Sequence, residues 1–283
     1  MSAYRVIQQT AAHRYKRLVT YDYRTVHSII NAATILHVSF SPAAADADAA
    51  TNAPAAAPAP SPAPSPAAPP PPSYPAILPM IGTMGLYAQP DADPAHTPLD
   101  LYLHGHASAR LMRQPSETAV SVSAALLDGV VLALTPYNHN CQFRSAVVVG
   151  RASVVRDADE KLWAMRLITD GLVAGRWEGS RTPPTEGEVR STSILKVVVD
   201  GASAKVNVAG PNNSRAELKD EGVVGRVWTG VVPVCSELFG TPVPCGDNRV
   251  EPVPEYLEEW VRKHNEEVKR HAGGETSSAE VEE

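Results

Sequence analysis

Cysteine is scarce in this sequence, basic residues are not in excess, and long apolar runs are missing. The three cysteines, Cys141, Cys235 and Cys245, are too few and too odd in number for a disulfide framework. Free thiols are the simplest interpretation, with a Cys235–Cys245 pair as the alternative. A formal net charge of −6 argues against a nucleic-acid-binding surface. Without a membrane-spanning run or a signal-peptide core after Met1, we expect a cytoplasmic protein with no membrane or nucleic-acid partner.

Several catalytic signatures are also missing. The sequence has no glycine-rich dinucleotide fingerprint, no P-loop and no Gly-x-Ser-x-Gly elbow, and its serines and histidines form no specific triad. His104 and His106 have the His-x-His spacing of some metal sites, but only His139 is a candidate for the third ligand. We therefore expect no metal site, and we name no catalytic acid or base.

Proline and alanine are concentrated in one segment. Residues 42–73 are almost entirely Ala, Pro, Ser and Asp, which leaves the segment little to bury and few amide donors for a sheet. We interpret it as a disordered, partly polyproline insert, or alternatively as a ligand for a proline-recognition domain. The expected organisation is a tail at residues 1–20, one domain at 21–250 interrupted by this insert, and a charged helix with a disordered tail at 251–283.

Short strands dominate the rest of the chain. Alternating and β-branched runs predict strands at residues 34–40, 74–83, 118–127, 130–135, 143–155, 194–199, 204–208 and 227–234. Helical periodicity and capping residues predict helices at 21–33, 157–172, 183–190 and 254–271. Asp128-Gly129 and Asp200-Gly201 lie between strand runs and predict hairpin turns, whereas Gly150 inside a strand predicts a bulge or a barrel corner. The pattern favours a mainly β, antiparallel barrel with added helices.

The segment at residues 99–113, LDLYLHGHASARLMR, is the main candidate for a binding site. Alternation predicts a short strand, Gly105 permits a sharp turn, and Ser108 is placed to cap a helical turn. A strand followed directly by a helix start exposes backbone amides, which suit an anion. The Ser108 hydroxyl and the Arg110 guanidinium add donors for phosphate oxygens. The alternative is an ordinary strand–turn–helix with an arginine facing solvent.

A second polar pair, Arg144 and Ser145, begins the most strand-like run of the chain. An arginine and a hydroxyl at that place either contact another polar part of a ligand or cap the edge of the sheet. The residues alone leave both readings open.

Six segments, read in order, resemble one known group of proteins. They are YDYRTVHSIINAATILHVSF, LYLHGHASARLMR, LLDGVVLAL, FRSAVVVGRA, EKLWAMRLITDGLVAGRW and ASAKV. From about Tyr21 to Trp228, the insert excepted, the chain resembles the flavin-nucleotide-binding proteins related to pyridoxamine 5′-phosphate oxidase. Within that group it is similar to the branch that includes the nitroimidazole-resistance (Nim-like) proteins.

The resemblance implies a split β-barrel, a homodimer, and FMN bound in the groove between the subunits. By similarity, eight residues contact the cofactor. His104, Ser108 and Arg110 would hold the phosphate, Pro79, Met80 and Ile81 would run beside the isoalloxazine, and Arg144 and Ser145 would reach it from the facing strand. The chain departs from the group at Ala109, where the oxidase has a second basic residue, and in the loop at 138–143.

The function that the resemblance implies is an FMN-dependent oxidoreductase acting on a small molecule that the sequence does not identify. In such a protein the flavin carries the electrons, and the chain supplies binding, orientation and local electrostatics. One alternative is a flavin-binding protein without enzymatic activity. Another is a split barrel that binds haem or a deazaflavin, with His104, His106 or His139 as haem ligands.

Overall fold

The computed structural model describes residues 2–42, 74–235, 238–244 and 252–272, together with Asn248 and Val250. Nearly all of the predicted insert, the C-terminal tail and Cys245 lie outside the described residues. The strands are β1 (Val19–Thr20), β2 (Leu36–Phe40), β3 (Ala76–Gly85), β4 (Asp100–His106), β5 (Thr118–Leu132), β6 (Asn140–Val154), β7 (Thr192–Asn207) and β8 (Gly230–Pro233). The helices are α1 (Tyr23–Ala32), α3 (Ala158–Leu172), α4 (Glu186–Ser191), α5 (Glu221–Val224) and α6 (Glu255–Ala272), with 3-10 turns η1 (Lys16–Leu18), η2 (Arg110–Arg113), η3 (Pro136–Asn138) and η4 (Glu217–Lys219).

Six antiparallel strands close into a barrel in the order β7-β4-β3-β2-β5-β6, because β6 pairs with β7. Two short strands extend the sheet, β1 on β7 and β8 on β5. The two halves of strand β3 pair with different neighbours: Ala76–Met80 pair with β2, and Ile81–Gly85 pair with β4. Pro79 lies in the first half, where β4 no longer runs alongside, so its missing amide hydrogen costs no ladder bond on that side. The predicted mainly β, antiparallel barrel is confirmed.

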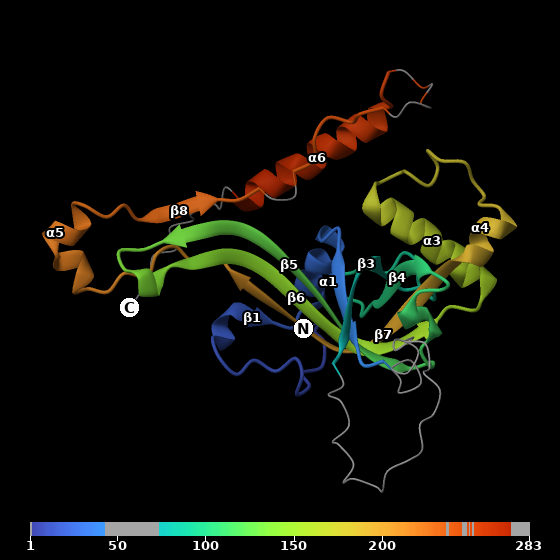
Figure 1. Ribbon diagram of the computed structural model, residues 1–283, viewed down its shortest axis with the longest axis horizontal. Helices are drawn as coiled ribbons and strands as arrows, with labels where there is room; N and C mark the ends of the chain where they lie inside the picture. The colour runs from blue at the N-terminus through green and yellow to red at the C-terminus, as the bar shows by residue number, and fades with distance from the viewer. Residues whose placement is uncertain are drawn as a thin grey trace, which may run out of the picture.

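Helices cover the barrel at two places (Figure 1). The helix α1 contributes Val26, Ile29 and Ile30 to the main core, and it begins at Asp22, whose side chain accepts from the Thr25 amide. The helix α3 packs on β3 and β4, where the buried Tyr102 donates to Glu160 Oε1 at 2.6 Å. Both predicted helices are confirmed to within two residues.

The strands β5 and β6 are longer than the sequence predicts, and their far ends form an arm with β8 and α5 (Figure 1). The two Asp-Gly pairs do not form hairpin turns. Strand β5 continues through Asp128, where its register with β6 shifts between Leu127 and Gly129. Strand β7 likewise continues through Asp200, where Val149 pairs with Gly201 and Gly150 pairs with Val199. Each aspartate is therefore the extra residue of a β-bulge, and the bulge predicted at Gly150 is confirmed.

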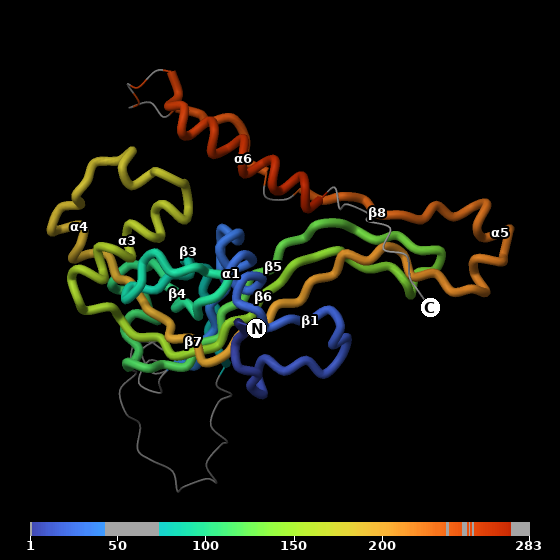
Figure 2. Tube along the Cα trace, turned by 180° about the vertical axis from the view of Figure 1, so that it is seen from behind, coloured from blue at the N-terminus to red at the C-terminus, as the bar shows by residue number. Residues whose placement is uncertain are grey.

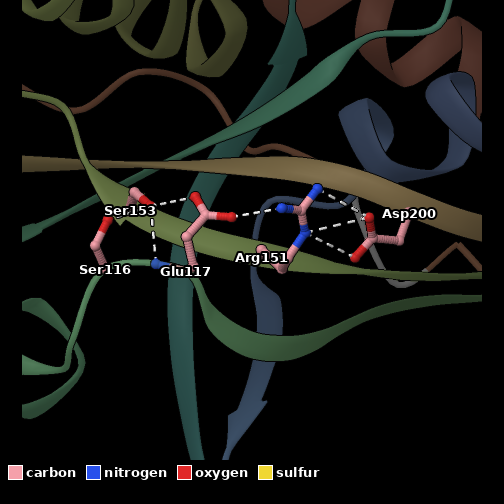
Figure 3. A network of polar contacts seen from close by, with 5 residues as sticks. All are labelled: Ser116, Glu117, Arg151, Ser153 and Asp200. Atoms are coloured by element: carbon pink, nitrogen blue, oxygen red, sulfur yellow. Dashed lines mark hydrogen bonds and ion pairs between the residues drawn. The ribbon is translucent and has the colours of Figure 1, made fainter.

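Each bulged aspartate binds an arginine of β6. The Asp128 carboxylate accepts from Arg144 Nε and Nη2 at 2.9 and 2.8 Å. The Asp200 carboxylate accepts from Arg151 at 3.2 Å, and Arg151 also donates to Glu117 at the start of β5 (Figure 3). A hairpin corner would expose these aspartates, whereas a bulge directs them at a neighbouring strand, which is why the turn prediction was wrong.

The N-terminal segment, predicted as a tail, packs against the barrel (Figure 2). Tyr4 is buried, and its hydroxyl lies 2.6 Å from His27 Nε2 on α1. The His27 Nδ1 atom lies 2.7 Å from the Pro94 carbonyl oxygen, so Nδ1 carries the hydrogen and Nε2 accepts from Tyr4. His27 therefore ties together three segments that are distant in sequence, and its role is structural.

We expect the free energy of unfolding to decrease as the pH falls below about 6.5, the usual histidine pKa. Burial lowers the pKa of His27 in the folded chain, so the unfolded chain takes up the proton first. The stabilisation by neutral His27 is fully present above the pKa that His27 has in the unfolded chain. It is lost as the pH falls toward the lower pKa of His27 in the folded chain. Urea denaturation of wild type and His27→Gln between pH 8 and 5 checks this, because the stability difference between them should shrink on acidification. Parallel pH profiles would contradict the assignment.

Candidate functional site

The corner between β4 and η2 holds three of the predicted phosphate ligands. Strand β4 ends at His106, and η2 begins at Arg110 with Ala109 as its N-cap and no side-chain cap. The prediction that Ser108 caps this turn is wrong. Its hydroxyl instead lies 2.8 Å from His106 Nδ1, and its amide donates to the same nitrogen at 3.2 Å. An imidazole two residues back offers Ser108 a nearer partner than the turn does.

The corner presents fewer backbone donors than predicted. The Ala107 amide donates to the Ser191 carbonyl at 3.2 Å, and the Ala109 amide donates to the His106 carbonyl at 2.9 Å. With the Ser108 amide on His106, three successive amides after β4 have partners within the chain. An anion bound at this corner must therefore be held mainly by side chains.

Arg110 is the positively charged group best placed to do so. Its side chain is exposed, and its guanidinium carbon lies 5.7 Å from the centroid of the buried Phe40 ring. The next two residues, Leu111 and Met112, are buried and fix the turn on the barrel. A cation stacked on an aromatic face keeps its N–H groups in one plane, available for phosphate oxygens.

His104 lies one strand away from the predicted flavin-ring segment, since it pairs with Ile81 across β3 and β4. Burial lowers the pKa of His104, so its imidazole is neutral at pH 7. A neutral imidazole offers a phosphate a hydrogen bond but no charge. The positive charge of the corner therefore comes from Arg110 and from the exposed Arg113 at the end of η2.

The structure separates the three residues predicted beside the isoalloxazine. Pro79 is exposed on the outer side of β3, whereas Met80 points inward and is packed in the core. Ile81 is half-buried on the same side as Pro79. Because side chains alternate along a strand, Met80 can meet a ligand on the outer side only through its backbone.

Ile81 and Arg144 are brought together at a cavity of about 340 Å³ between the barrel strands and the C-terminal segment. Its walls come from the end of α1, from β3, from the bulged part of β5 and β6, and from the C-terminal segment. The polar and aromatic groups among the lining residues are Ser28, Asn31, Thr34, Thr83, Asp128, Arg144, Phe239, Trp260, His264, Glu267 and His271. Ser145 is not in this group: its hydroxyl donates to the Lys205 carbonyl at 3.3 Å.

Arg144 enters the cavity already paired. Its two bonds to Asp128 form a bidentate pair in which the side chains are 19% and 10% exposed. The Asp128 carboxylate therefore fixes the orientation of the guanidinium and cancels its charge. The sequence left two roles open for Arg144, contact with a ligand and capping of the sheet edge. The structure adds a third role, in which the Arg144 guanidinium stabilises the β5 bulge.

One wall of the cavity is aromatic and belongs to the C-terminal segment. The Phe239 ring lies 4.8 Å from Trp260 and 4.2 Å from His264, measured between ring centroids. The Asn265 side chain bonds both the amide and the carbonyl of Phe239 at 2.8 Å, which joins that residue to α6. The sequence predicted a charged helix in this segment, but not its place at a cavity.

Sequence reasoning missed Asp128 and the aromatic wall. Asp128 was assigned to a turn, because Asp-Gly is the strongest local hairpin signal and nothing local distinguishes it from a bulge. Phe239 and Trp260 are separated by a stretch of irregular chain, so their contact is visible only in three dimensions. The apolar spacing of Trp260 with Tyr256 and Leu257 was the one available signal.

The three histidines considered as metal or haem ligands do not meet. His104 and His106 lie on β4, where His104 pairs with Ile194 of β7, next to the Leu195 that pairs with Val154 at one end of β6. His139 follows η3 and precedes Asn140 at the other end of β6. The His139 Nδ1 atom accepts from the Ala133 amide at 2.9 Å. Within the described ranges, no cluster of three His, Cys, Asp or Glu residues is arranged to hold a metal ion, and no helix there is long and apolar enough to cross a bilayer.

The comparisons with known proteins agree with this architecture. A family model described as Pyridoxamine 5'-phosphate oxidase matches residues 70–206. The solved structure of the flavocytochrome Anf3 from Azotobacter vinelandii is 25% identical, with a TM-score of 0.65 over 90% of this chain and 97% of that chain. The FAD and heme binding protein from Mycobacterium smegmatis is 19% identical, with a TM-score of 0.62 over 86% of this chain and 97% of that chain. No curated protein sequence matches the chain.

We expect the Asp128–Arg144 pair to show a coupling energy of about 2 kcal/mol or more in a double-mutant cycle, because removing one partner leaves a largely buried charge. The cycle uses Asp128→Ala, Arg144→Ala and the double variant in urea denaturation. Arg190 and Glu186 on α4 are the control, since their side chains are 74% and 91% exposed. That exposed pair should couple by less than about 1 kcal/mol. Equal coupling in the two cycles would contradict the structural role of Asp128.

Proposed function

We propose that this chain binds a flavin nucleotide and acts as an oxidoreductase on a small molecule. The match of residues 70–206 to the pyridoxamine 5′-phosphate oxidase model and the six-stranded barrel support the proposal. The observation that carries the proposal is the corner after β4. There, the exposed Arg110 and the Ser108 hydroxyl lie beyond the strand pair that joins His104 to Ile81. Both ends of a flavin nucleotide thus have residues of suitable chemistry on adjacent strands.

In this proposal the corner binds the phosphate through side chains. Arg110 supplies charge and directed N–H groups, and His104 supplies a neutral hydrogen-bonding partner. The Ser108 hydroxyl would have to turn from His106 Nδ1 to the phosphate when the nucleotide binds. Arg113 lies on the same turn and adds positive charge, so the second basic group that Ala109 lacks has a substitute nearby. These side chains fit a phosphate. The backbone contributes fewer hydrogen bonds to it, because the amides of residues 107–109 already have partners within the chain.

The flavin ring is placed along the outer side of β3. Pro79 and Ile81 offer an apolar edge there, and the Met80 backbone lies between them. Arg144 reaches the same region from β6 while held by Asp128, so it orients a ring edge by hydrogen bonding rather than by net charge. When bound, the flavin supplies the electron transfer itself.

FMN is the form of the cofactor that we propose, and a homodimer is the assembly. The same outer side of the sheet carries exposed Ile77 and Leu127 among the small side chains of Ser121, Ser123 and Ala125. A flat face of small and exposed apolar residues suits a second copy of the chain. Sedimentation equilibrium of the purified protein measures this, and a monomer at micromolar concentration would contradict it.

A second candidate is a barrel that binds haem in addition to flavin. It is favoured by the 25% identity to a protein named as a flavocytochrome, over 90% of this chain. In the present chain His139 and His104 lie near opposite ends of the 15-residue strand β6, so they cannot share an iron in one subunit. A haem ligand in this chain must therefore come from one of these places alone, from another histidine, or from both subunits.

We expect Arg110→Ala to weaken FMN binding by about a hundredfold, because two charge-assisted hydrogen bonds of about 1.5–3 kcal/mol each are lost in part. Fluorescence titration of the apoprotein with FMN gives the dissociation constants. Arg262→Ala on α6, an exposed arginine paired with Glu266, should leave the constant unchanged. An unchanged constant in Arg110→Ala would remove Arg110 from the site.

The absorption spectrum of the protein as purified should show flavin bands, and mass spectrometry of the released cofactor should give FMN. Release of FAD would correct the nucleotide, and an additional Soret band would establish the haem candidate. Stopped-flow reduction by NADH or NADPH and reoxidation by acceptors then separate an oxidoreductase from a flavin-binding protein without activity. A bound flavin inert to all of them would support the latter.

A further inference from the structure

A network of charged and hydroxyl side chains lies where the chain passes from η2 into β5 (Figure 3). Arg151 of β6 donates to Glu117 Oε2 at 2.6 Å and, through other N–H groups, to the Asp200 carboxylate at 3.2 Å. The Ser153 hydroxyl donates to Glu117 Oε1 at 3.0 Å and accepts from the Glu117 amide at 3.0 Å. Both the carboxylate and the amide of Glu117 are therefore bound by side chains of β6.

The backbone of Glu117 has an uncommon conformation. Its φ of 65° lies in the left-handed region, which residues other than glycine rarely adopt because their Cβ atom crowds the backbone. Such a conformation persists only where the surroundings hold it. The bonds to Arg151 and Ser153 do so, and they fix the side of the chain on which the carboxylate lies.

Glu117 is the one carboxylate in the stretch that follows the corner between β4 and η2. The sequence holds no other Asp or Glu between Asp100 and Asp128. The turn η2 carries Arg110 and Arg113, and no carboxylate of the described residues forms an ion pair with either of them. The positive charge of the corner is therefore available to a ligand while Glu117 is bound to β6.

The strand register shows that Glu117 lies near these arginines. The Arg110 guanidinium carbon is 5.7 Å from the centroid of the Phe40 ring, and Phe40 of β2 pairs with Val120 of β5. Val120 follows Glu117 by three residues on the same strand, a rise of about 10 Å. Asp200, in contrast, lies on β7, which is on the far side of β6.

We propose that Arg151 is a positioning residue for this corner and that it sets the preference of the corner for a phosphate ester over an uncharged group. Arg151 keeps the Glu117 carboxylate paired with β6, so that the charge of Arg110 and Arg113 is left to the ligand. Arg151 acts through Glu117 and does not have to touch the ligand. The inference rests on the proposed function in one respect, since the ester is taken to be that of a flavin nucleotide.

An unpaired Glu117 would compete with the ligand. Carboxylates and phosphates bind guanidinium groups with the same bidentate geometry, so a carboxylate four residues from Arg113 competes for the donors that a phosphate needs. Opposite charges at a protein surface still attract at about 10 Å, which is the screening length at 0.1 M salt. The bonds from Arg151 and Ser153 prevent this competition because they direct the carboxylate toward β6 (Figure 3).

We expect Arg151→Met to lower the preference for FMN over riboflavin about tenfold, because riboflavin has the same ring without the phosphate. The loss should come from the FMN dissociation constant, with the riboflavin constant unchanged. Fluorescence titration of the apoprotein with each compound at low salt measures both constants. An equal preference in Arg151→Met and wild type would overturn the inference.

Two double variants distinguish the pairing of Glu117 from a change in net charge. Arg151→Met combined with Glu117→Gln and Arg151→Met combined with Asp200→Asn have the same net charge, and each removes one of the two carboxylates that Arg151 binds. Glu117→Gln should restore the preference for FMN, whereas Asp200→Asn should not, because only Glu117 lies beside η2. Restoration by both substitutions, or by neither, would contradict the role of Glu117.

Ser153→Ala is a second variant in case Arg151→Met does not fold. It leaves every charge in place and removes the hydroxyl that binds Glu117. A carboxylate held less firmly should lower the preference for FMN about threefold. Ser180→Ala removes a hydroxyl that donates to the Arg176 carbonyl in the loop after α3, and it is the control. An unchanged preference in Ser153→Ala, or an equal change in Ser180→Ala, would count against the inference.

Inorganic phosphate separates this inference from the proposed function, because its binding needs the corner but no flavin. Phosphate should raise the Tm of wild type and of the Arg151→Met/Glu117→Gln variant more than that of Arg151→Met. This order in a protein that binds neither FMN nor riboflavin would overturn the proposed function and preserve the role of Arg151. FMN binding with the same phosphate response in all three proteins would do the reverse. A protein that binds neither a flavin nor phosphate would overturn both.

Discussion

Two ion pairs that involve arginines of β6 mark the points where the long strands β5 and β7 bulge. At each, an aspartate bulges from the neighbouring strand and binds an arginine, Asp128 with Arg144 and Asp200 with Arg151. A bulge bends and twists a strand without ending it. Strands of 15 and 16 residues can therefore close a barrel at one end and continue as an arm at the other. The cavity lies at the first of these bulges, so the feature that shapes the strand also supplies the polar groups of the site.

The two parts of the candidate site differ in how they are built. The corner after β4 is exposed, and its positive charge comes from two arginines on one 3-10 turn. The cavity is more enclosed, and its one arginine is neutralised before any ligand arrives. A phosphate suits the first environment and an uncharged ring suits the second. The pairing of Ile81 with His104 places these environments on adjacent strands, which is what a nucleotide with a phosphate at one end and a ring at the other requires.

Much of the fold was predictable because local patterns and tertiary packing agree. Asp22 and Asp157 cap α1 and α3 as their positions before apolar runs indicate, and Gly150 marks a shift of register. Predictions failed where a local signal has two tertiary outcomes. Asp128-Gly129 and Asp200-Gly201 have turn chemistry, but in each case an arginine across the sheet provides a partner that favours a continuous strand with a bulge. Ser108 failed as a cap for a similar reason, since His106 captures its hydroxyl and amide.

The sequence by itself determined the class of fold, the positions of most strands along the chain and the segment that carries His104, Ser108 and Arg110, because hydrophobic alternation and motif order are local properties. Only the tertiary structure decided which donors remain for a ligand, which aspartates pair with β6, and that α6 completes a cavity. These depend on contacts made across the sequence: Arg144 and Trp260, for example, line the same cavity although they are more than a hundred positions apart. No local pattern records such a contact, because its free energy exists only once the barrel has closed.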